Sequence, residues 1–449
     1  MTYRRKQTIM ELWLRTSLLL CAFGFFRELR PSEPFVTEFL SGEWRNITVD
    51  QVYREIYPWG TYSYLSLLVV VFLITDMLRY KIIIIASAGV GIVLWSLLLW
   101  TTSIQAIICV QVCYGFFMAS EVAYYTYMYA KVDKEKYQLV TGHTRSAILA
   151  GRFLSAVLAQ LLISYSLMDV RELNYISFGS QFASLACSIA LPSVGASLYF
   201  YSTVDSRKAL AASNSNNQLE ELKVENGSGD ASQPKFSCHG AFELFWIHFK
   251  ISYSNKVVIQ WSFWWALAMC GFLQVQSYVQ LLWQQIDPDK ENLYNGAAEG
   301  ILTLSGALSA FAAGLLNSKK FIQWDVWILA GCSLLEGGFI LWSALTHNVW
   351  IAYVMYILFG TVYHFMITMA SASVAKQLHD DSFAFIFGIN TLVALTFQTI
   401  LTVVLVSEQG FELDQRTHYQ ALSGYFFVLG GIYAATSIGQ ILYKKIKVR

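Results

Sequence analysis

The sequence predicts an all-α membrane protein, organised as a 6+6 bundle of spanning helices. Of its 449 residues, 55% are apolar and only 14% are charged. Soluble globular domains carry about 25% charged residues, so the composition excludes that class. Roughly a dozen apolar stretches fill the chain almost end to end, and each is about long enough to cross a hydrocarbon core of ~30 Å as a helix. The lipid bilayer is therefore the first partner that the sequence implies.

The first half of the chain, residues 1–201, is predicted to hold six spanning helices. Its earliest apolar stretch begins near Leu12 and contains Arg15. An Arg-Pro-Ser-Glu-Pro stretch starting at Arg30 follows, not a small-residue cleavage pattern, so we interpret this stretch as a retained helix, not a signal peptide. The six predicted helices cover residues 11–28, 60–79, 82–101, 104–130, 144–167 and 173–200.

The second half, residues 257–449, repeats this pattern with six more predicted helices. Residues 202–256 separate the two halves and are rich in Ser, Asn, Glu and Lys. Such a composition cannot bury a core, so we expect a linker here. The six predicted helices of this half cover residues 257–284, 293–316, 325–346, 349–375, 383–406 and 418–444.

The distribution of basic residues predicts how the bundle is oriented. Short cytoplasmic loops of membrane proteins are rich in Lys and Arg. Basic residues gather at both chain ends and in loops after even-numbered helices, whereas several alternate loops are acidic or neutral. We therefore expect both termini to be cytoplasmic. The loop at 30–57 then lies outside the cell, where Asn46 begins an Asn-Ile-Thr glycosylation acceptor.

Two six-helix halves joined by a cytoplasmic linker are the arrangement of a major-facilitator transporter, whose halves rock around a site near the midplane. The sequence holds no Gly-rich phosphate loop, metal-ligand cluster or nucleophile–base constellation, so we expect neither an enzyme nor a cofactor. The seven cysteines form no CxxC pair, and the net charge of +1 indicates no nucleic-acid partner.

Glu121 is the clearest candidate for a functional residue, because it is predicted to lie in the middle of a spanning helix. An ionisable group there costs a few kcal/mol on insertion scales. Tyr114 and Tyr125 fall on or near its face, and a carboxylate among aromatic rings is a plausible cation site. The alternative is a structural ion pair. Arg152 on the next predicted helix either neutralises Glu121 or Asp76, or receives an anionic group of the substrate.

Other polar residues are assigned by their positions along the predicted helices. Glu33 lies where the first helix meets the outside, and Glu299 lies early in the eighth helix, so both are candidates for the cavity. Asp76 and Arg79 end the second helix with a spacing similar to the acidic–basic gate of major-facilitator proteins. Arg145 is expected to serve gating or lipid contact. The aromatic candidates for stacking on a flat heterocycle are Tyr57, Trp95 and Tyr278.

At these residues the chain resembles the family of reduced folate carriers and thiamine transporters. The resemblance covers both halves and includes the sequon after the first helix. It implies that acidic and aromatic side chains hold the rings of the substrate, and it maps that role onto Glu33, Tyr57, Trp95, Tyr114, Ser277, Tyr278 and Glu299. The matching stretches are residues 24–35, 62–81, 114–125, 261–283, 294–299 and 387–402.

Within this family the charge of the substrate divides the members. Folate carriers resemble one another in basic residues of the fourth, tenth and eleventh helices, where this chain has Glu121, Gly360 and Gln398. Glu121 and Gln398 are instead similar to the thiamine transporters. Two positions depart from them: Gln111 replaces a Glu, and Arg152 replaces an aromatic residue.

The resemblance therefore favours a plasma-membrane vitamin carrier that moves thiamine or a close analogue by alternating access. A reduced folate carrier is the main alternative. A phosphorylated thiamine, another organic cation such as pyridoxine, and a receptor that binds the vitamin without moving it also stay open.

Overall fold

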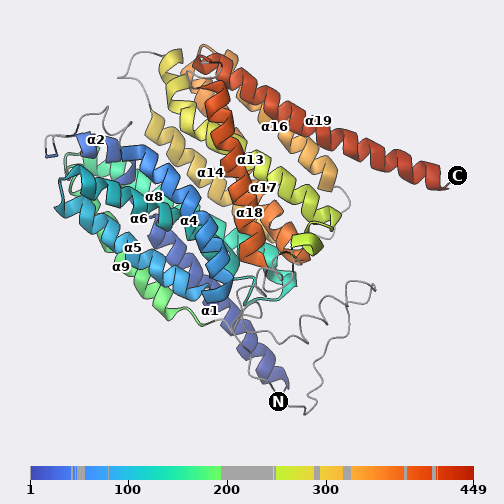
Figure 1. Cartoon of the computed structure of the whole chain (residues 1–449), viewed down its shortest axis with the longest axis horizontal. Coiled ribbons are helices and arrows are strands. Elements are labelled where there is room, and N and C mark those ends of the chain that lie inside the picture. The colour runs from blue at the N-terminus through green and yellow to red at the C-terminus, as the bar shows by residue number, and fades with distance from the viewer. Residues whose placement is uncertain are drawn as a thin grey trace.

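The computed structural model describes residues 2–41, 44–45, 47, 56–78, 80–193, 246, 249–287, 294–316, 325–378, 382–406, 411 and 413–448. All regular secondary structure in these residues is helical. Helices α1 to α9 lie together on one side of the molecule, and α13 to α19 lie on the other (Figure 1). The predicted all-α, two-part bundle is thus confirmed.

Six long helices build each part when α6 and α7 are counted as one. In the first part, these are α1 (Thr2–Glu28), α4 (Tyr57–Leu78), α5 (Lys81–Trp100), α6 (Ile104–Ala119) with α7 (Glu121–Tyr127), α8 (Tyr137–Ser164) and α9 (Leu173–Ala190). In the second part, they are α13 (Lys256–Ile286), α14 (Asn295–Leu315), α16 (Asp325–Leu345), α17 (Val349–Gln377), α18 (Phe383–Leu405) and α19 (Gln415–Val448).

Several helix ends differ from the prediction. Helix α1 begins at Thr2 instead of residue 11, and α8 begins at Tyr137 instead of residue 144. The fourth predicted helix is interrupted at Ser120 alone, so Glu121 opens α7 but still lies inside the spanning segment Ile104–Tyr127. The Ser120 hydroxyl donates a hydrogen bond to the carbonyl of Phe117 at 2.6 Å, and the hydroxyl oxygen of Ser87 lies 2.5 Å from it. Serine hydroxyls of this kind compete with the helical backbone pattern.

Nine helical segments among the described residues are long and apolar enough to span a membrane. Helix α9 is not among them, although it packs in the same bundle, and the described part of α4 contributes the shorter apolar segment Tyr62–Thr75. In α9 the reason is a row of buried polar residues on the face toward α1 and α5. That row lowers the hydropathy of α9 without exposing polar groups to lipid, and it consists of Asn174, Ser177, Ser180, Gln181, Ser184 and Ser188.

The two halves touch closely at one end of the bundle, which we call the closed end. Here the start of α8 meets the end of α14, and a Cβ added to Gly142 would lie 2.6 Å from Cα of Gly314. Gln138 donates to the carbonyl of Ala313 at 2.7 Å. Lys134 donates across the halves to the carbonyl of Leu378 at 3.2 Å. The sequence predicts this end to be cytoplasmic.

A short 3₁₀ turn, η1 (Glu33–Phe35), and helix α2 (Val36–Ser41) follow α1 at the opposite end of the first half. Neither element was predicted. Pro31 and Pro34 explain why α1 cannot continue, because proline removes a backbone donor and clashes with the preceding turn. The chain therefore turns here and places Ser32 and Glu33 toward the space between the halves.

Candidate substrate-binding cavity

A cavity of about 660 Å³ lies between the two halves, beyond the closed end. Its first-half wall comes from η1, α2, α4, α5, α6, α7 and α8, and its second-half wall comes from α13, α17 and α18. The volume lies in the range of small-molecule sites, which are mostly apolar with a few polar groups that orient the ligand. The charged side chains among the lining residues are Glu33, Glu121, Arg145 and Arg152.

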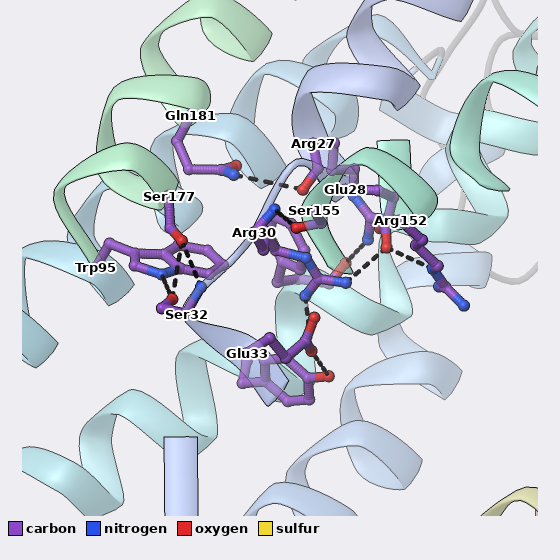
Figure 2. Close-up of polar contacts among 12 residues, drawn as sticks. Arg27, Glu28, Arg30, Ser32, Glu33, Trp95, Arg152, Ser155, Ser177 and Gln181 are labelled. Atoms are coloured by element: carbon purple, nitrogen blue, oxygen red, sulfur yellow. Dashed lines mark hydrogen bonds and ion pairs between the residues drawn. The ribbon is translucent and has the colours of Figure 1, made fainter. Parts of the chain in front are cut away.

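The polar row of α9 holds the end of α1 in place. Ser180 donates to the carbonyl of Leu29 at 2.8 Å, and the hydroxyls of Ser177 and Ser32 are 2.8 Å apart. From α8, Ser155 accepts the backbone N–H of Arg30 at 2.6 Å (Figure 2). The bonds to Leu29 and Arg30 engage backbone groups at the helix end, where water is scarce and polar groups need partners within the protein.

Glu28, at the last position of α1, binds three arginines. Its Oε1 accepts from Arg27 at 2.8 Å, and its Oε2 accepts from Arg30 at 2.6 Å and from Nε of Arg152 at 2.8 Å (Figure 2). The Glu28 side chain is fully buried. Arg27 also donates to the carbonyl of Phe117, and its guanidinium lies 4.1 Å from the centre of that ring. The cluster joins α1, α6 and α8 behind the cavity wall.

This arrangement decides which acid Arg152 pairs with. From the sequence, the candidate partners of Arg152 are Glu121, Asp76 and an anionic group of the substrate. The structure instead pairs Arg152 with Glu28, which the sequence analysis did not single out. The two residues are far apart in the sequence and meet only because α1 packs against α8. Arg152 does line the cavity, and 34% of its side chain is exposed there.

Glu121 lines the cavity without an ion-pair partner. No cationic group among the described residues lies within 4 Å of its carboxylate. Arg152, Tyr64 and Tyr125 are close enough to interact with it electrostatically. Of the two alternatives for Glu121, the structural ion pair with Arg152 is therefore not formed among the described residues. A carboxylate bordered by phenol rings remains available to a cation from the cavity.

Glu33, Tyr114 and Trp95 meet at the α2 side of the cavity. Tyr114 donates to Oε1 of Glu33 at 2.9 Å, and Arg30 forms an ion pair with the same oxygen at 3.1 Å. The Glu33 side chain keeps 39% exposure. Trp95 donates from Nε1 to Ser32 at 3.2 Å, which fixes its ring against the cavity. The structure thus brings these three predicted residues to one wall with Glu121 and Arg152.

The second-half candidates are placed differently. Glu299 accepts from Tyr356 at 2.9 Å and from Gln276 at 3.4 Å; Gln276 lines the cavity, and Glu299 lies behind it. Ser277 donates to the carbonyl of Leu273 on its own helix, and Tyr278 packs edge-on against His418 with ring centres 4.9 Å apart. Neither Ser277 nor Tyr278 lines this cavity, because each residue rotates the helix by about 100° away from Gln276.

Arg79 and Asn46 lie outside the described residues, as do the side chains of Tyr57 and Asp76. The gate and glycosylation predictions therefore stay predictions.

Several cavity residues were not predicted. Trp265, Met269, Phe272 and Gln276 follow one another on α13 at spacings of four, three and four, which place them on one face. That periodicity was a usable signal. Arg145 was assigned to gating or lipid contact, yet it lines the cavity and also donates across the halves to Ser371 at 2.8 Å.

The two helical parts and the cavity between them define a major-facilitator-type fold. The same fold occurs in the crystal structure of the human organic anion transporter MFSD10 (TETRAN), with a TM-score of 0.61 at 12% identity over 95% of this chain and 99% of that one.

Sequence similarity then identifies the family. The family model for the reduced folate carrier matches residues 11–421. The chain is 35% identical to thiamine transporter 1 of Mus musculus, covering 99% of this chain and 93% of that protein. It is 36% identical to thiamine transporter 2 of Homo sapiens, covering 95% and 90%, and 34% identical to folate transporter 1 of Caenorhabditis elegans, covering 94% and 91%. The chain therefore belongs to the reduced folate carrier family.

Proposed function

We propose that this chain is a plasma-membrane carrier that moves thiamine, or a closely similar aromatic cation, by alternating access. The relatives named thiamine transporters and the central cavity support this function. Both termini would be cytoplasmic, and the closed end would then face the cytoplasm. In this conformation the cavity would receive substrate from the outside.

The observation that carries the proposal is the unpaired carboxylate of Glu121. Arg152, the cation that the sequence offers as a partner of Glu121, forms its ion pair with Glu28 instead, at 2.8 Å. A unit positive charge about 4 Å from Glu121 would gain about 4 kcal/mol at an effective dielectric of 20. That gain is large compared with an ordinary hydrogen bond, and it favours a cationic ring over a neutral one.

The remaining lining residues fit a flat ring. Trp95 and Tyr114 lie on one wall, and Trp265 and Phe272 lie on the opposite wall. Aromatic faces attract cations and stack on heterocycles. We therefore assign ring binding to Glu33, Trp95, Tyr114 and Glu121. Glu299 accepts a hydrogen bond from Gln276 behind the cavity wall, and it would act by orienting the Gln276 amide.

Folate is the alternative substrate. Its carboxylates need basic partners, and the two second-half positions that are basic in folate carriers lack charge here. Gln398 lines the cavity as an amide. Gly360 is covered by Leu302, whose Cδ1 would lie 2.5 Å from a Cβ at that position. These residues disfavour a folate-type arrangement.

Uptake by the purified full chain in liposomes tests the proposal. Labelled thiamine and labelled folate are offered separately, with unlabelled thiamine inside the vesicles in a second series. We expect saturable thiamine uptake that internal thiamine accelerates. A preference for folate would replace the proposed substrate, whereas saturable binding without countertransport would indicate a receptor.

A further inference from the structure

We propose that the segment just before α13 binds anionic lipid headgroups and transmits this binding to α18. Residues 246 and 249–254 form this segment, which we call the pre-α13 segment. It lies at the closed end, outside the central cavity. The proposal concerns the membrane as a partner of the protein, so it does not depend on which compound the carrier moves.

A stripe of aromatic rings runs along the pre-α13 segment. Trp246, Phe249 and Tyr253 are three and four residues apart, which is the spacing of one helix face. The rings of Trp246 and Phe249 lie at 6° with centres 5.5 Å apart, and the centres of Phe249 and Tyr253 are 4.7 Å apart. Trp246 is 58% exposed, whereas Tyr253 is half-buried. The stripe thus leads from the surface into the bundle, and its outer end is an indole ring of the kind that occupies membrane interfaces.

The charge next to this indole ring selects the kind of lipid. The ammonium group of Lys250 lies 5.3 Å from the centre of the Trp246 ring, and Lys250 is exposed. Lys256, which begins α13, is also exposed. Among the described residues, no acidic group lies within 4 Å of either ammonium group. Lysines that flank an apolar aromatic face are suited to negatively charged headgroups above the acyl chains.

The position of the segment favours a lipid surface over a soluble partner. Helix α13 is long and apolar enough to span a membrane from Lys256 to Ile286, so the segment lies where the chain enters the bilayer. Asn255 donates to Gln377 at the end of α17 at 3.1 Å, which fixes this level of the bundle at the closed end. A lipid leaflet therefore lies within reach of both Trp246 and Lys250.

Tyr253 connects the pre-α13 segment to a contact between the two halves. Its hydroxyl donates to Oδ1 of Asn390 on α18 at 2.8 Å, and Nδ2 of Asn390 donates to Ser262 on α13 at 3.0 Å. Gly388, two residues earlier on α18, packs directly on Phe72 of α4 in the other half. Lipid that holds the segment in place also restrains α18 where the halves meet.

Fluorescence quenching by brominated lipids tests the lipid contact. The purified full chain is placed in nanodiscs with increasing fractions of brominated phosphatidylserine or brominated phosphatidylcholine. The signal of Trp246 is the difference between wild type and Trp246→Phe. We expect half-maximal quenching at an about fivefold lower fraction of phosphatidylserine, the effect of one lysine at an anionic surface. Trp342→Phe is the matched control, because Trp342 on α16 is also 58% exposed and should respond equally to both lipids.

Two further variants test the assigned residues. Lys250→Gln should remove the preference for phosphatidylserine while Trp246 is still quenched by both lipids, and high salt should have the same effect in wild type. Tyr253→Phe should keep the preference. Phosphatidylserine added to detergent-solubilised protein should raise the melting temperature of wild type more than that of Tyr253→Phe, because the variant lacks the hydrogen bond to Asn390.

The possible outcomes are distinct. Equal quenching of Trp246 by the two lipids would overturn the proposal. Absence of quenching by either lipid would also overturn it and would indicate a soluble protein as the partner of this surface. An unchanged preference in Lys250→Gln would overturn the role of Lys250, and an equal rise in melting temperature in Tyr253→Phe would overturn the link to α18. None of these measurements involves transport, so the proposed function stands or falls separately.

Discussion

Arg152 donates from Nε to Oε2 of Glu28 at 2.8 Å, and this bond determines the charge of the cavity. Glu28 is fully buried and pairs with three guanidinium groups, and water cannot supply the negative charge that these groups need. Because Arg152 is tied to Glu28, the carboxylate of Glu121 on the same wall has no ion-pair partner within 4 Å among the described residues. An acid at the end of α1 thereby keeps an acid on α7 available to substrate.

Replacing Glu121 with glutamine should reduce thiamine uptake by about 10- to 100-fold, because the variant loses a charged interaction worth about 1.5–3 kcal/mol. The amide keeps the volume and the hydrogen-bonding capacity of the side chain, so surface expression should persist. Initial uptake rates normalised to the amount of protein measure the effect. Glu135→Gln, which changes an exposed acid in the turn before α8, is the matched control. Unchanged uptake in Glu121→Gln would remove this residue from the binding site.

Glu28→Gln should lower the free energy of unfolding by about 3–5 kcal/mol, because it leaves the buried guanidinium of Arg27 without a counter-charge and leaves Arg30 with Glu33 alone. Arg152→Gln should cost less, because Glu28 keeps its bonds to Arg27 and Arg30 at 2.8 and 2.6 Å. Thermal unfolding of both variants in the same detergent compares the two effects. Equal stability losses would contradict the view that Glu28 is the centre of the cluster.

The helical architecture was predictable from the sequence because each spanning segment is apolar over its own length. No contact with a distant part of the chain is needed to recognise such a segment. Placement of Trp95, Tyr114 and Glu121 on one wall also followed largely from helix spacing and family resemblance. The partner of Arg152 did not, because Glu28 lies more than a hundred residues away and reaches α8 only through tertiary packing. Ser277 and Tyr278 show that closeness in sequence to a cavity residue does not by itself place a side chain in the cavity. They are adjacent in sequence to Gln276, but one or two residues of helix rotation direct their side chains away from this cavity.

Variants of Tyr278 and Tyr114 test which side chains belong to the binding site. Tyr278→Phe should leave thiamine uptake within about twofold of wild type, because the ring keeps its edge-on contact with His418. Tyr114→Phe should weaken uptake several-fold, because it removes the hydrogen bond that orients Glu33. Concentration-dependent uptake of the two variants, measured side by side, distinguishes these positions. A stronger effect of Tyr278→Phe would place the substrate on a different face of α13.

The close approach of Gly142 and Gly314 should determine how readily the two halves come together at the closed end. A methyl group at residue 142 would lie 2.6 Å from Cα of Gly314 and 2.8 Å from the carbonyl oxygen of Ala310, so backbone must move. Overpacking of this kind costs about 1–3 kcal/mol and destabilises only the conformation in which the glycines meet. Gly142→Ala should therefore slow transport and favour the conformation that is open at this end.

Spin labels at the exposed residues Asp133 and Gln377 report the separation of the halves at that end. The mean distance between the labels should lengthen in Gly142→Ala. Gly300→Ala is the control, because a Cβ at residue 300 of α14 meets no atom within 4 Å. If both glycine variants give the wild-type distance and rate, the close approach of α8 and α14 does not limit closure.

Glu336 on α16 should be dispensable for transport and costly for stability. Its side chain is fully buried, and neither carboxyl oxygen has a hydrogen-bond partner in the part of the chain that the structure describes. It lies close enough to Tyr363 for an electrostatic interaction, but only Tyr363 lines the cavity. Glu336→Met keeps a similar side-chain length and removes two unsatisfied polar atoms, so it should raise the free energy of unfolding by about 1–3 kcal/mol. The apparent melting temperature in detergent measures this gain, and thiamine uptake should stay at the wild-type rate. A stabilised protein with impaired uptake would instead reveal that the carboxyl group takes part in the transport cycle through Tyr363.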